Sequence, residues 1–222
     1  MREALAAGAV EELFATAEAI GRHPELAAGA AEISERDAAA LSETVTPQGL
    51  VAVCRLIQPS LAQLLDARPR LLAVLVEPNE PGNLGAILRS ADAAGADAVV
   101  LDGGVDPYNG KVVRATAGSL FHLPVVSAPV TELLASPVIA SLATTGAGTA
   151  DLADLIADQT LTQPTAWLFG NEARGLPQPV LDQADRTVRV PIYGRAESLN
   201  LAAAAAVCLY SSALAQHRRL PA

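Results

Sequence analysis

Side chains that could bind a ligand or take part in a reaction gather in three loops, at residues 77–89, 168–177 and 190–201. Each loop follows an apolar run, precedes a polar or helical segment and contains both glycine and asparagine. Ligands of parallel α/β sheets bind where strands end in such loops. Three loops of the same kind therefore predict a common site better than three unrelated turns. The side chains that stand out in them are Asn83, Arg89, Glu172, Ser198 and Asn200.

Each loop, taken alone, also has an ordinary structural interpretation. Asn83 and Ser198 could cap the helices that follow, with Asn200 inside the first turn of its helix, because Asn and Ser accept hydrogen bonds from free N–H groups at helix starts. Glu172 could bind a polar group or orient Arg174, or the two could form a solvated ion pair. The first loop lacks the Gly-x-Gly-x-x-Gly fingerprint, which argues against a dinucleotide-dependent dehydrogenase.

Short aliphatic runs supply the strands that would position these loops. They are rich in Val, Leu and Ile and are bounded by Gly, Pro or Asp, as strands commonly are. From residue 71 onward most of them are continuously apolar, which is typical of a parallel sheet covered on both faces. The expected strands are Val10–Thr16, Leu50–Leu56, Leu71–Glu77, Ala98–Asp102, Pro124–Ser127, Val138–Thr144, Thr165–Gly170 and Thr187–Ile192.

Helical segments fall between these strands. Ser34 is a candidate N-cap for a helix that ends at Leu41, and Leu84–Ala94 is amphipathic and is followed by Gly95, a residue that often ends helices. The alanine-rich segment Ser198–Gln216 has high helix propensity. The alternation of strands and helices predicts an α/β fold with a parallel sheet.

The strand pattern breaks at residues 57–70, which we interpret as a linker between a small α/β domain at residues 1–56 and a larger α/β domain at residues 71–222. The larger domain has the usual size of an independently folding unit. The smaller one opens inside a helical segment, Arg2–Ala7, with no strand before it. Because small domains bury proportionally less surface, we expect its N-terminal portion to be incomplete or to be supported by a neighbour.

Composition excludes several classes of protein. Hydrophobic residues make up 51% and charged residues 18% of the 222 residues, which excludes a disordered chain. No membrane-spanning apolar run and no signal peptide are visible, and two cysteines cannot build a disulfide framework or a four-cysteine zinc site. Three scattered histidines provide no metal-site spacing. We therefore expect a soluble, cytoplasmic protein without a metal. The net charge of −9 argues against a general nucleic-acid coat protein but allows an enzyme with a local basic groove.

Three segments, in this order along the chain, resemble the SpoU (TrmH-like) family of RNA ribose methyltransferases in the SPOUT superfamily. They are Asn83–Arg89, Phe169–Leu176 and Val190–Leu201, and Lys111–Gly118 also resembles a family segment. The resemblance extends over residues 71–216, and the three motifs together are far more specific than any one of them. Residues 1–56 resemble the small α/β substrate-binding domain that often precedes the catalytic domain, without its first strand.

The resemblance implies a fold, a cofactor and an assembly. The parallel sheet would have helices on both faces and a C-terminal trefoil knot, which is a rare exception to the rules of chain threading. The loops of the knot would bind S-adenosylmethionine in a bent shape, and the enzyme would act on RNA as a homodimer. The cofactor-binding residues implied in this way are Thr144, Leu168, Gly170, Asn171, Ile192, Leu199 and Leu201.

The implied reaction transfers a methyl group to a ribose 2′-hydroxyl of RNA, and the type of the small N-terminal domain favours ribosomal RNA over transfer RNA as the target. Because a hydroxyl is a poor nucleophile, the protein must position and activate it. Arg89 matches the catalytic arginine of the family. It would act either as a base, against a guanidinium pKa above about 12, or by binding the adjacent phosphate and stabilising negative charge on oxygen. The supporting positions are Asn83, Glu172, Ser198 and Asn200, and the RNA-contacting candidates are Lys111, Arg114 and Arg174.

A second class of function stays open beside the enzyme. The chain could be a catalytically inactive, knotted protein that binds RNA or the ribosome. The net charge of −9 and the short N-terminal part favour this alternative. The intact set of Asn83, Arg89, Glu172, Ser198 and Asn200 disfavours it.

Overall fold

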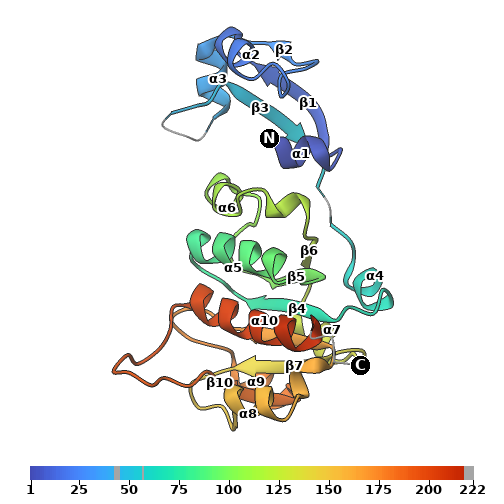
Figure 1. The fold of residues 1–222 in the computed structure, drawn as a ribbon, viewed down its shortest axis with the longest axis vertical. Helices are drawn as coiled ribbons and strands as arrows, with labels where there is room; N and C mark the ends of the chain where they lie inside the picture. The colour runs from blue at the N-terminus through green and yellow to red at the C-terminus, as the bar shows by residue number, and fades with distance from the viewer. Residues whose placement is uncertain (43–45, 57, 218–222) are drawn as a thin grey trace. The chain divides into compact units, whose positions relative to one another are not determined.

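The computed structural model describes residues 1–42, 46–56 and 58–217 of the chain. It consists of two compact units, Met1–Ile57 and Gln58–Ala222, and each unit has a sheet of its own (Figure 1). All three loops that carry candidate site residues belong to the second unit.

The first unit is built on a three-stranded sheet in the order β2-β1-β3. The central strand β1 pairs in parallel with β2 and antiparallel with β3. Thr16 and Ser34 cap α2 and α3, since their hydroxyl oxygens accept hydrogen bonds from the N–H groups of Ala19 and Asp37. Its elements are α1 (Arg2–Ala6), β1 (Val10–Ala15), α2 (Ala17–Arg22), β2 (Ala31–Glu32), α3 (Glu35–Leu41) and β3 (Leu50–Cys54).

The second unit is built on a seven-stranded sheet in the order β6-β5-β4-β9-β7-β10-β8, and every pairing in it is parallel. The predicted parallel α/β sheet is therefore confirmed. The strands are β4 (Leu71–Val76), β5 (Ala98–Asp102), β6 (Val125–Ser127), β7 (Ala140–Thr144), β8 (Ala150–Asp151), β9 (Thr165–Phe169) and β10 (Arg186–Arg189). The central strands β4 and β9 consist entirely of buried residues, which explains their continuously apolar sequence.

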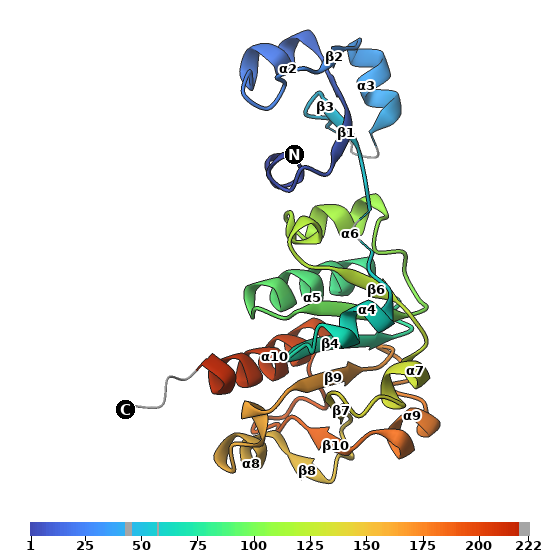
Figure 2. The same ribbon diagram turned by 90° about the vertical axis from the view of Figure 1, so that its right-hand side faces the viewer.

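Helices cover both faces of this sheet (Figure 2). Alternate residues of β4 point to opposite faces, so that Leu71, Ala73 and Leu75 pack with α5 (Pro81–Ala93), α8 (Leu152–Ala157) and α10 (Leu201–His217). Leu72, Val74 and Val76 pack on the other face with α4 (Leu61–Asp66), α7 (Val130–Leu134) and α9 (Gln178–Gln183). The helix α6 (Gly110–Ala115) packs against α5, and two short 3-10 turns, η1 (Ser119–Phe121) and η2 (Thr160–Thr162), complete the unit.

The long C-terminal helix α10 is anchored to the centre of the sheet. The indole Nε1 of Trp167 on β9 donates a 2.9 Å hydrogen bond to the Oγ of Ser212, and both side chains are fully buried. Cys208 lies on the same buried side of the helix, and burial raises the pKa of its thiol to about 12. Cys208 is thus a protonated packing residue.

The segment predicted as a linker contains a helix, so this part of the prediction is wrong. Residues 61–66 form α4, whose start is fixed by a capping box in which Ser60 and Gln63 exchange side-chain-to-backbone hydrogen bonds. Leu61 and Leu64 are buried against the sheet of the second unit. The prolines that broke the strand pattern flank the helix and leave it intact.

Element boundaries also differ from the predicted ones near the site. Helix α5 begins at Pro81 instead of Leu84, and α10 begins at Leu201 instead of Ser198. The last strand, β10, ends at Arg189, before the predicted end at Ile192. The two-residue strands β2 and β8 were not predicted. None of the helices in the described part of the chain is long and apolar enough to cross a membrane.

Candidate functional site

A cavity of about 510 Å³ lies where the loops after β7, β9 and β10 meet the starts of α5 and α10. Its volume falls in the usual range for cofactor and small-molecule sites, about 300 to 1,000 Å³. The carboxyl ends of parallel strands meet at one edge of the sheet, which explains why loops far apart in sequence share this cavity. The predicted site residues that line it are Asn83, Thr144, Gly170, Asn171, Glu172, Ile192, Ser198, Leu199, Asn200 and Leu201.

Five predicted site residues lie outside the lining of this cavity. Leu168 is fully buried beneath it, where its carbonyl oxygen accepts a 2.8 Å hydrogen bond from the Oγ1 of Thr144. Arg89 is exposed on α5, and its guanidinium has no hydrogen bond or ion pair with another described residue. Lys111 and Arg114 are exposed on α6, and Arg174 borders a separate hollow of about 210 Å³.

Several lining residues had no predicted role. Thr145 and Gly146 extend the loop after β7, and Val188 lies on β10. Glu80 and Glu197 also line the cavity. Glu80 is the N-cap residue of α5, and the signal that could have revealed it is Pro81, because proline favours the first position of a helix.

A chain of side-chain hydrogen bonds connects the three loops. The Nδ2 of Asn200 donates to the Oδ1 of Asn83 at 3.0 Å, and the Nδ2 of Asn83 donates to the Oε1 of Glu172 at 3.0 Å. Asn200 also caps α10, since its Oδ1 accepts hydrogen bonds from the N–H groups of Ala202 at 2.9 Å and Ala203 at 3.4 Å. The predicted capping roles are therefore wrong for Ser198, which lies before the cap, and for Asn83, which lies inside α5 and bonds across loops.

The carboxylate of Glu172 caps α5 from another part of the chain. Glu80, at the N-cap position, makes no side-chain capping bond, and instead its own N–H and that of Asn79 donate to Glu172 at 3.2 and 3.0 Å. Partial burial raises the pKa of Glu172, but the hydrogen bonds from Asn83, Asn79 and Glu80 outweigh burial and hold this pKa below its ordinary value. Glu172 is thus a charged group that fixes the loop after β4 to the loop after β9.

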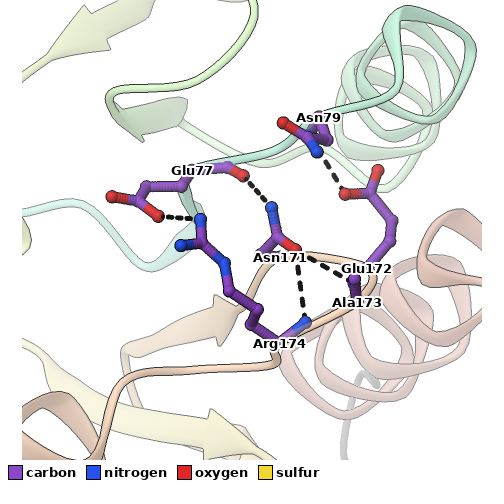
Figure 3. Close-up of polar contacts among 6 residues, drawn as sticks. All are labelled: Glu77, Asn79, Asn171, Glu172, Ala173 and Arg174. Atoms are coloured by element: carbon purple, nitrogen blue, oxygen red, sulfur yellow. Dashed lines mark hydrogen bonds and ion pairs between the residues drawn. The ribbon is translucent and has the colours of Figure 1, made fainter.

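Asn171 organises the turn that follows β9 (Figure 3). Its side chain is buried, its Nδ2 donates to the carbonyl oxygen of Glu77 at 2.8 Å, and its Oδ1 accepts from the N–H groups of Ala173 and Arg174 at 3.0 and 3.2 Å. Glu77 has a left-handed backbone with φ of 49°, which these bonds help to hold. The Glu172–Arg174 ion pair, which was one of the possible interpretations of this loop, does not form, because the turn directs Arg174 to the Oε2 of Glu77, 2.5 Å away.

Gly170 allows the turn to close upon itself. A Cβ at this position would lie 2.2 Å from the backbone carbon of Gly175 and from the backbone nitrogen of Leu176. Backbone atoms cannot move aside as a flexible side chain can, so a larger residue would displace the turn and the cavity wall. A Cβ at Gly148, in the loop after β7, would likewise lie 2.4 Å from backbone atoms of Val188 and Arg189.

The described part of the chain contains no group of three or more His, Cys, Asp or Glu side chains that could hold a metal ion. The cavity instead combines apolar walls from Val188, Val190 and Ile192 with amide, hydroxyl and carboxylate groups. Such a lining suits a ligand with an extended apolar part and a few polar ends.

Comparison with protein families matches residues 70–210 to the SpoU rRNA Methylase family. The chain belongs to the SpoU family. The family match includes every residue that lines the cavity. The sequence-based assignment to this family is thus confirmed.

Two curated proteins are similar to most of this chain. A 23S rRNA (guanosine(2553)-2′-O)-methyltransferase, RlmP, of Bacillus subtilis is 41% identical over 80% of this chain and 70% of its own length. A 23S rRNA (uridine(2479)-2′-O)-methyltransferase of Streptomyces viridochromogenes is 38% identical over 75% of this chain and 60% of its own length. The chain therefore spans about two thirds of the length of these two relatives.

A solved SpoU structure has the same fold over nearly the whole chain. The SpoU methyltransferase AviRb from Streptomyces viridochromogenes, in complex with the cofactor AdoMet, superposes with a TM-score of 0.80 at 32% identity. The superposition covers 96% of this chain and 85% of that one. The chain thus has the fold of a SpoU methyltransferase structure.

Proposed function

We propose that this protein is an S-adenosylmethionine-dependent methyltransferase that methylates a ribose 2′-hydroxyl of ribosomal RNA. The observation that carries the proposal is the meeting of the three family motifs around one cavity, with Asn200, Asn83 and Glu172 hydrogen-bonded in series. The two curated relatives act on the 2′-oxygen of 23S rRNA, one at a guanosine and the other at a uridine. The proposal therefore names the ribose and leaves the base open.

The cavity suits S-adenosylmethionine in size and in chemistry. Apolar side chains of Val188, Ile192, Leu199 and Leu201 would cover the adenine and ribose, and polar groups of the loops would bind the amino-acid end. Thr144 and Gly170 would contact the cofactor through their backbone atoms, since the hydroxyl of Thr144 already donates a hydrogen bond to the carbonyl oxygen of Leu168. Bound S-adenosylmethionine supplies an electrophilic methyl group with a good leaving group, and the protein supplies position and activation.

The asparagines and Glu172 of the site would act as positioning residues. The Asn171 side chain has both its amide and its carbonyl group bonded to the protein, so its part in cofactor binding would be to shape the turn after β9. Asn83, Glu172 and Asn200 would keep the starts of α5 and α10 at a fixed separation across the cavity. Ser198 is exposed at the mouth of the cavity and would face the RNA.

Arg89 would activate the ribose through its positive charge. It is exposed on α5, the helix whose start lines the cavity, so an RNA strand at the mouth of the cavity could bring a phosphate to its guanidinium. Charge stabilisation at the attacking oxygen needs no deprotonation of Arg89, whereas a role as base does. The surface residues Lys111, Arg114 and Arg174 would bind the RNA backbone.

We also propose that the protein is a cytoplasmic homodimer, because ribosomal RNA is the target and α10 presents an apolar stripe. Val207, Tyr210 and Leu214 follow one another at helical spacing and are 43%, 42% and 68% exposed. Several large apolar side chains on one exposed helix face favour a contact with a second copy.

We also propose that the second unit contains a trefoil knot. It is supported by family membership and by the contact of Gly148 with the end of β10.

The experiment that tests this proposal follows labelled methyl groups from S-adenosylmethionine into 23S rRNA. We expect transfer by the intact protein, and we expect Arg89→Ala to lower the rate about 100- to 1,000-fold with unchanged cofactor affinity. Arg186→Ala, which removes an exposed arginine of the same unit outside the cavity, is the matched control. Cofactor binding without transfer to any ribosomal RNA would instead favour an inactive RNA-binding protein.

A further inference from the structure

The charged side chains that line the cavity all carry the same sign. Glu80, Glu172 and Glu197 line it, and no lysine, arginine or histidine is among the lining residues. An excess of one charge in a recessed site selects ligands of opposite charge, because the low-dielectric walls focus the field. The cavity therefore favours a positively charged occupant.

Glu172 contributes less to this field than the other two carboxylates do. Its charge is balanced by the side chain of Asn83 and by the backbone N–H groups at the start of α5. Glu80 and Glu197 are exposed, and neither carboxylate forms a hydrogen bond or ion pair with another described residue. Two carboxylates are thus left to act on whatever occupies the cavity.

Methyl transfer changes the charge of the bound molecule, and the following inference rests on the proposed function. S-adenosylmethionine carries a sulfonium, an ammonium and a carboxylate, and its net charge is positive. When the sulfur–methyl bond breaks, its electron pair stays on sulfur, the ribose oxygen gains the methyl group and the hydroxyl proton leaves to solvent. The product, S-adenosylhomocysteine, has a neutral thioether and no net charge.

We propose that Glu80 and Glu197 make the cavity selective for the positively charged methyl donor over its uncharged product. The two carboxylates line the same cavity from the segments that precede α5 and α10, so both would act on a positive charge that the cavity holds. A carboxylate about 8 Å from a sulfonium, at an effective dielectric constant of about 40, changes affinity about fivefold. The two carboxylates together thereby favour exchange of product for fresh donor and limit product inhibition.

The test measures binding by calorimetry, with S-adenosylmethionine, S-adenosylhomocysteine and sinefungin as ligands. Sinefungin carries an amine in place of the sulfonium methyl group, so it keeps the positive charge without being a methyl donor. The variants are Glu80→Gln, Glu197→Gln and the double variant, which keep the shape of the side chains. Glu132→Gln on α7 removes an exposed carboxylate that does not line the cavity and serves as the matched control.

We expect the double variant to bind the two charged ligands about 25-fold more weakly and the uncharged product less than about twofold more weakly. In the wild-type protein, raising the salt concentration from about 0.05 to about 0.5 M should weaken the binding of the charged ligands more than that of the product. This second measurement needs no variant to fold.

Equal losses for all three ligands would overturn the inference, because they would assign Glu80 and Glu197 a structural role. Unchanged affinity for the charged ligands would overturn it as well. Both results would leave the proposed function standing, since the wild-type protein would still bind its donor. Failure of the wild-type protein to bind any of the three ligands would instead overturn the proposed function, and the selectivity with it.

Discussion

The asparagine side chains of this site form hydrogen bonds to other groups of the protein, and their main role is therefore structural. The amide nitrogen of Asn171 donates to the carbonyl oxygen of Glu77, and its amide oxygen accepts from the N–H groups of Ala173 and Arg174. The side chains of Asn83 and Asn200 are hydrogen-bonded to each other. A short polar side chain with both groups engaged fixes the geometry of a loop at little cost in conformational entropy. The asparagines of the motifs thereby hold three separate loops together as one wall of the cavity.

Replacement of Asn171 tests this view directly. Asn171→Ala leaves the carbonyl oxygen of Glu77 and the N–H groups of Ala173 and Arg174 without their partners, so we expect a loss of about 2 to 3 kcal/mol in the free energy of unfolding. Urea denaturation measures this loss. Asn79→Ala is the control, because Asn79 contributes its backbone N–H to the site and this group survives the change. Equal stability of the two variants would contradict the assigned role of Asn171.

Glu172 makes part of the stability dependent on pH. Its folded-state pKa lies below its ordinary value, so its contribution is fully present above the ordinary glutamate pKa of about 4.3 and is lost as pH falls through the lower folded value. We expect Glu172→Gln to cost about 1 kcal/mol at neutral pH and less below about pH 4. Unfolding curves of both proteins from about pH 7 to 3 measure the difference. A difference that does not shrink in acid would show that the charge of Glu172 is not what matters.

At the scale of elements, close backbone contacts shape the cavity wall. Gly170 and Gly146 both line the cavity, but an added Cβ at residue 170 meets backbone atoms at 2.2 Å, whereas one at residue 146 meets nothing within 4 Å. We expect Gly170→Ala to destabilise the protein by more than about 2 kcal/mol and Gly146→Ala by less than about 1 kcal/mol. Thermal unfolding of the two variants provides the comparison, and equal melting temperatures would refute the claim that the turn needs a glycine at residue 170.

Most strands of the sheet could be predicted from sequence because the two central strands, β4 and β9, are buried on both faces and must be apolar throughout. The missed strands β2 and β8 have two residues each and are held by their neighbours, so no local pattern marks them. The start of α5 was misplaced because Asn83 has the residue type of a cap, although its partners lie 89 and 117 residues away along the chain. Such partners are set by tertiary structure and leave no local signal.

The candidate site could be predicted as a set of loops, but not as a set of contacts. The motif residues Asn83, Glu172 and Asn200 do lie together, as their resemblance to one family implied. The pairing of Arg174 with Glu77 instead of Glu172, and the capping of α5 by Glu172, depend on how the turn at residues 171–175 folds. The lining carboxylates of Glu80 and Glu197 had no predicted role, because only the fold shows that their loops line the same cavity.

At the scale of the whole molecule, charge constrains how RNA can bind. Residues 1–57 hold nine acidic and four basic residues, so the N-terminal unit has a net charge of −5. Electrostatic attraction does not bring a unit with this negative charge to RNA, because lysine or arginine side chains are needed to neutralise the backbone phosphates. The proposed RNA contacts therefore lie in the second unit, at Lys111, Arg114 and Arg174, and a role of the N-terminal unit in RNA binding would depend on shape and hydrogen bonding.

The proposed dimer also belongs to this scale. Leu214 is the most exposed member of the α10 stripe, and a charge there would have to be buried in an interface between two copies. We expect Leu214→Glu to convert a dimer into a monomer without lowering its helix content. Sedimentation equilibrium measures the mass, and Ile156→Glu, at an exposed apolar residue of α8, is the control. A Leu214→Glu protein that sediments as the wild type would place the interface elsewhere.

The most direct test of the whole account locates the methyl group in the product RNA. The intact protein is incubated with 23S rRNA and S-adenosylmethionine, the RNA is digested to nucleosides, and mass spectrometry assigns the added methyl group to ribose or base. The account predicts one 2′-O-methylated nucleoside that is formed by the wild-type protein and nearly absent with Arg89→Ala. A methyl group on a base, or no methylation by a protein that binds the cofactor, would contradict it.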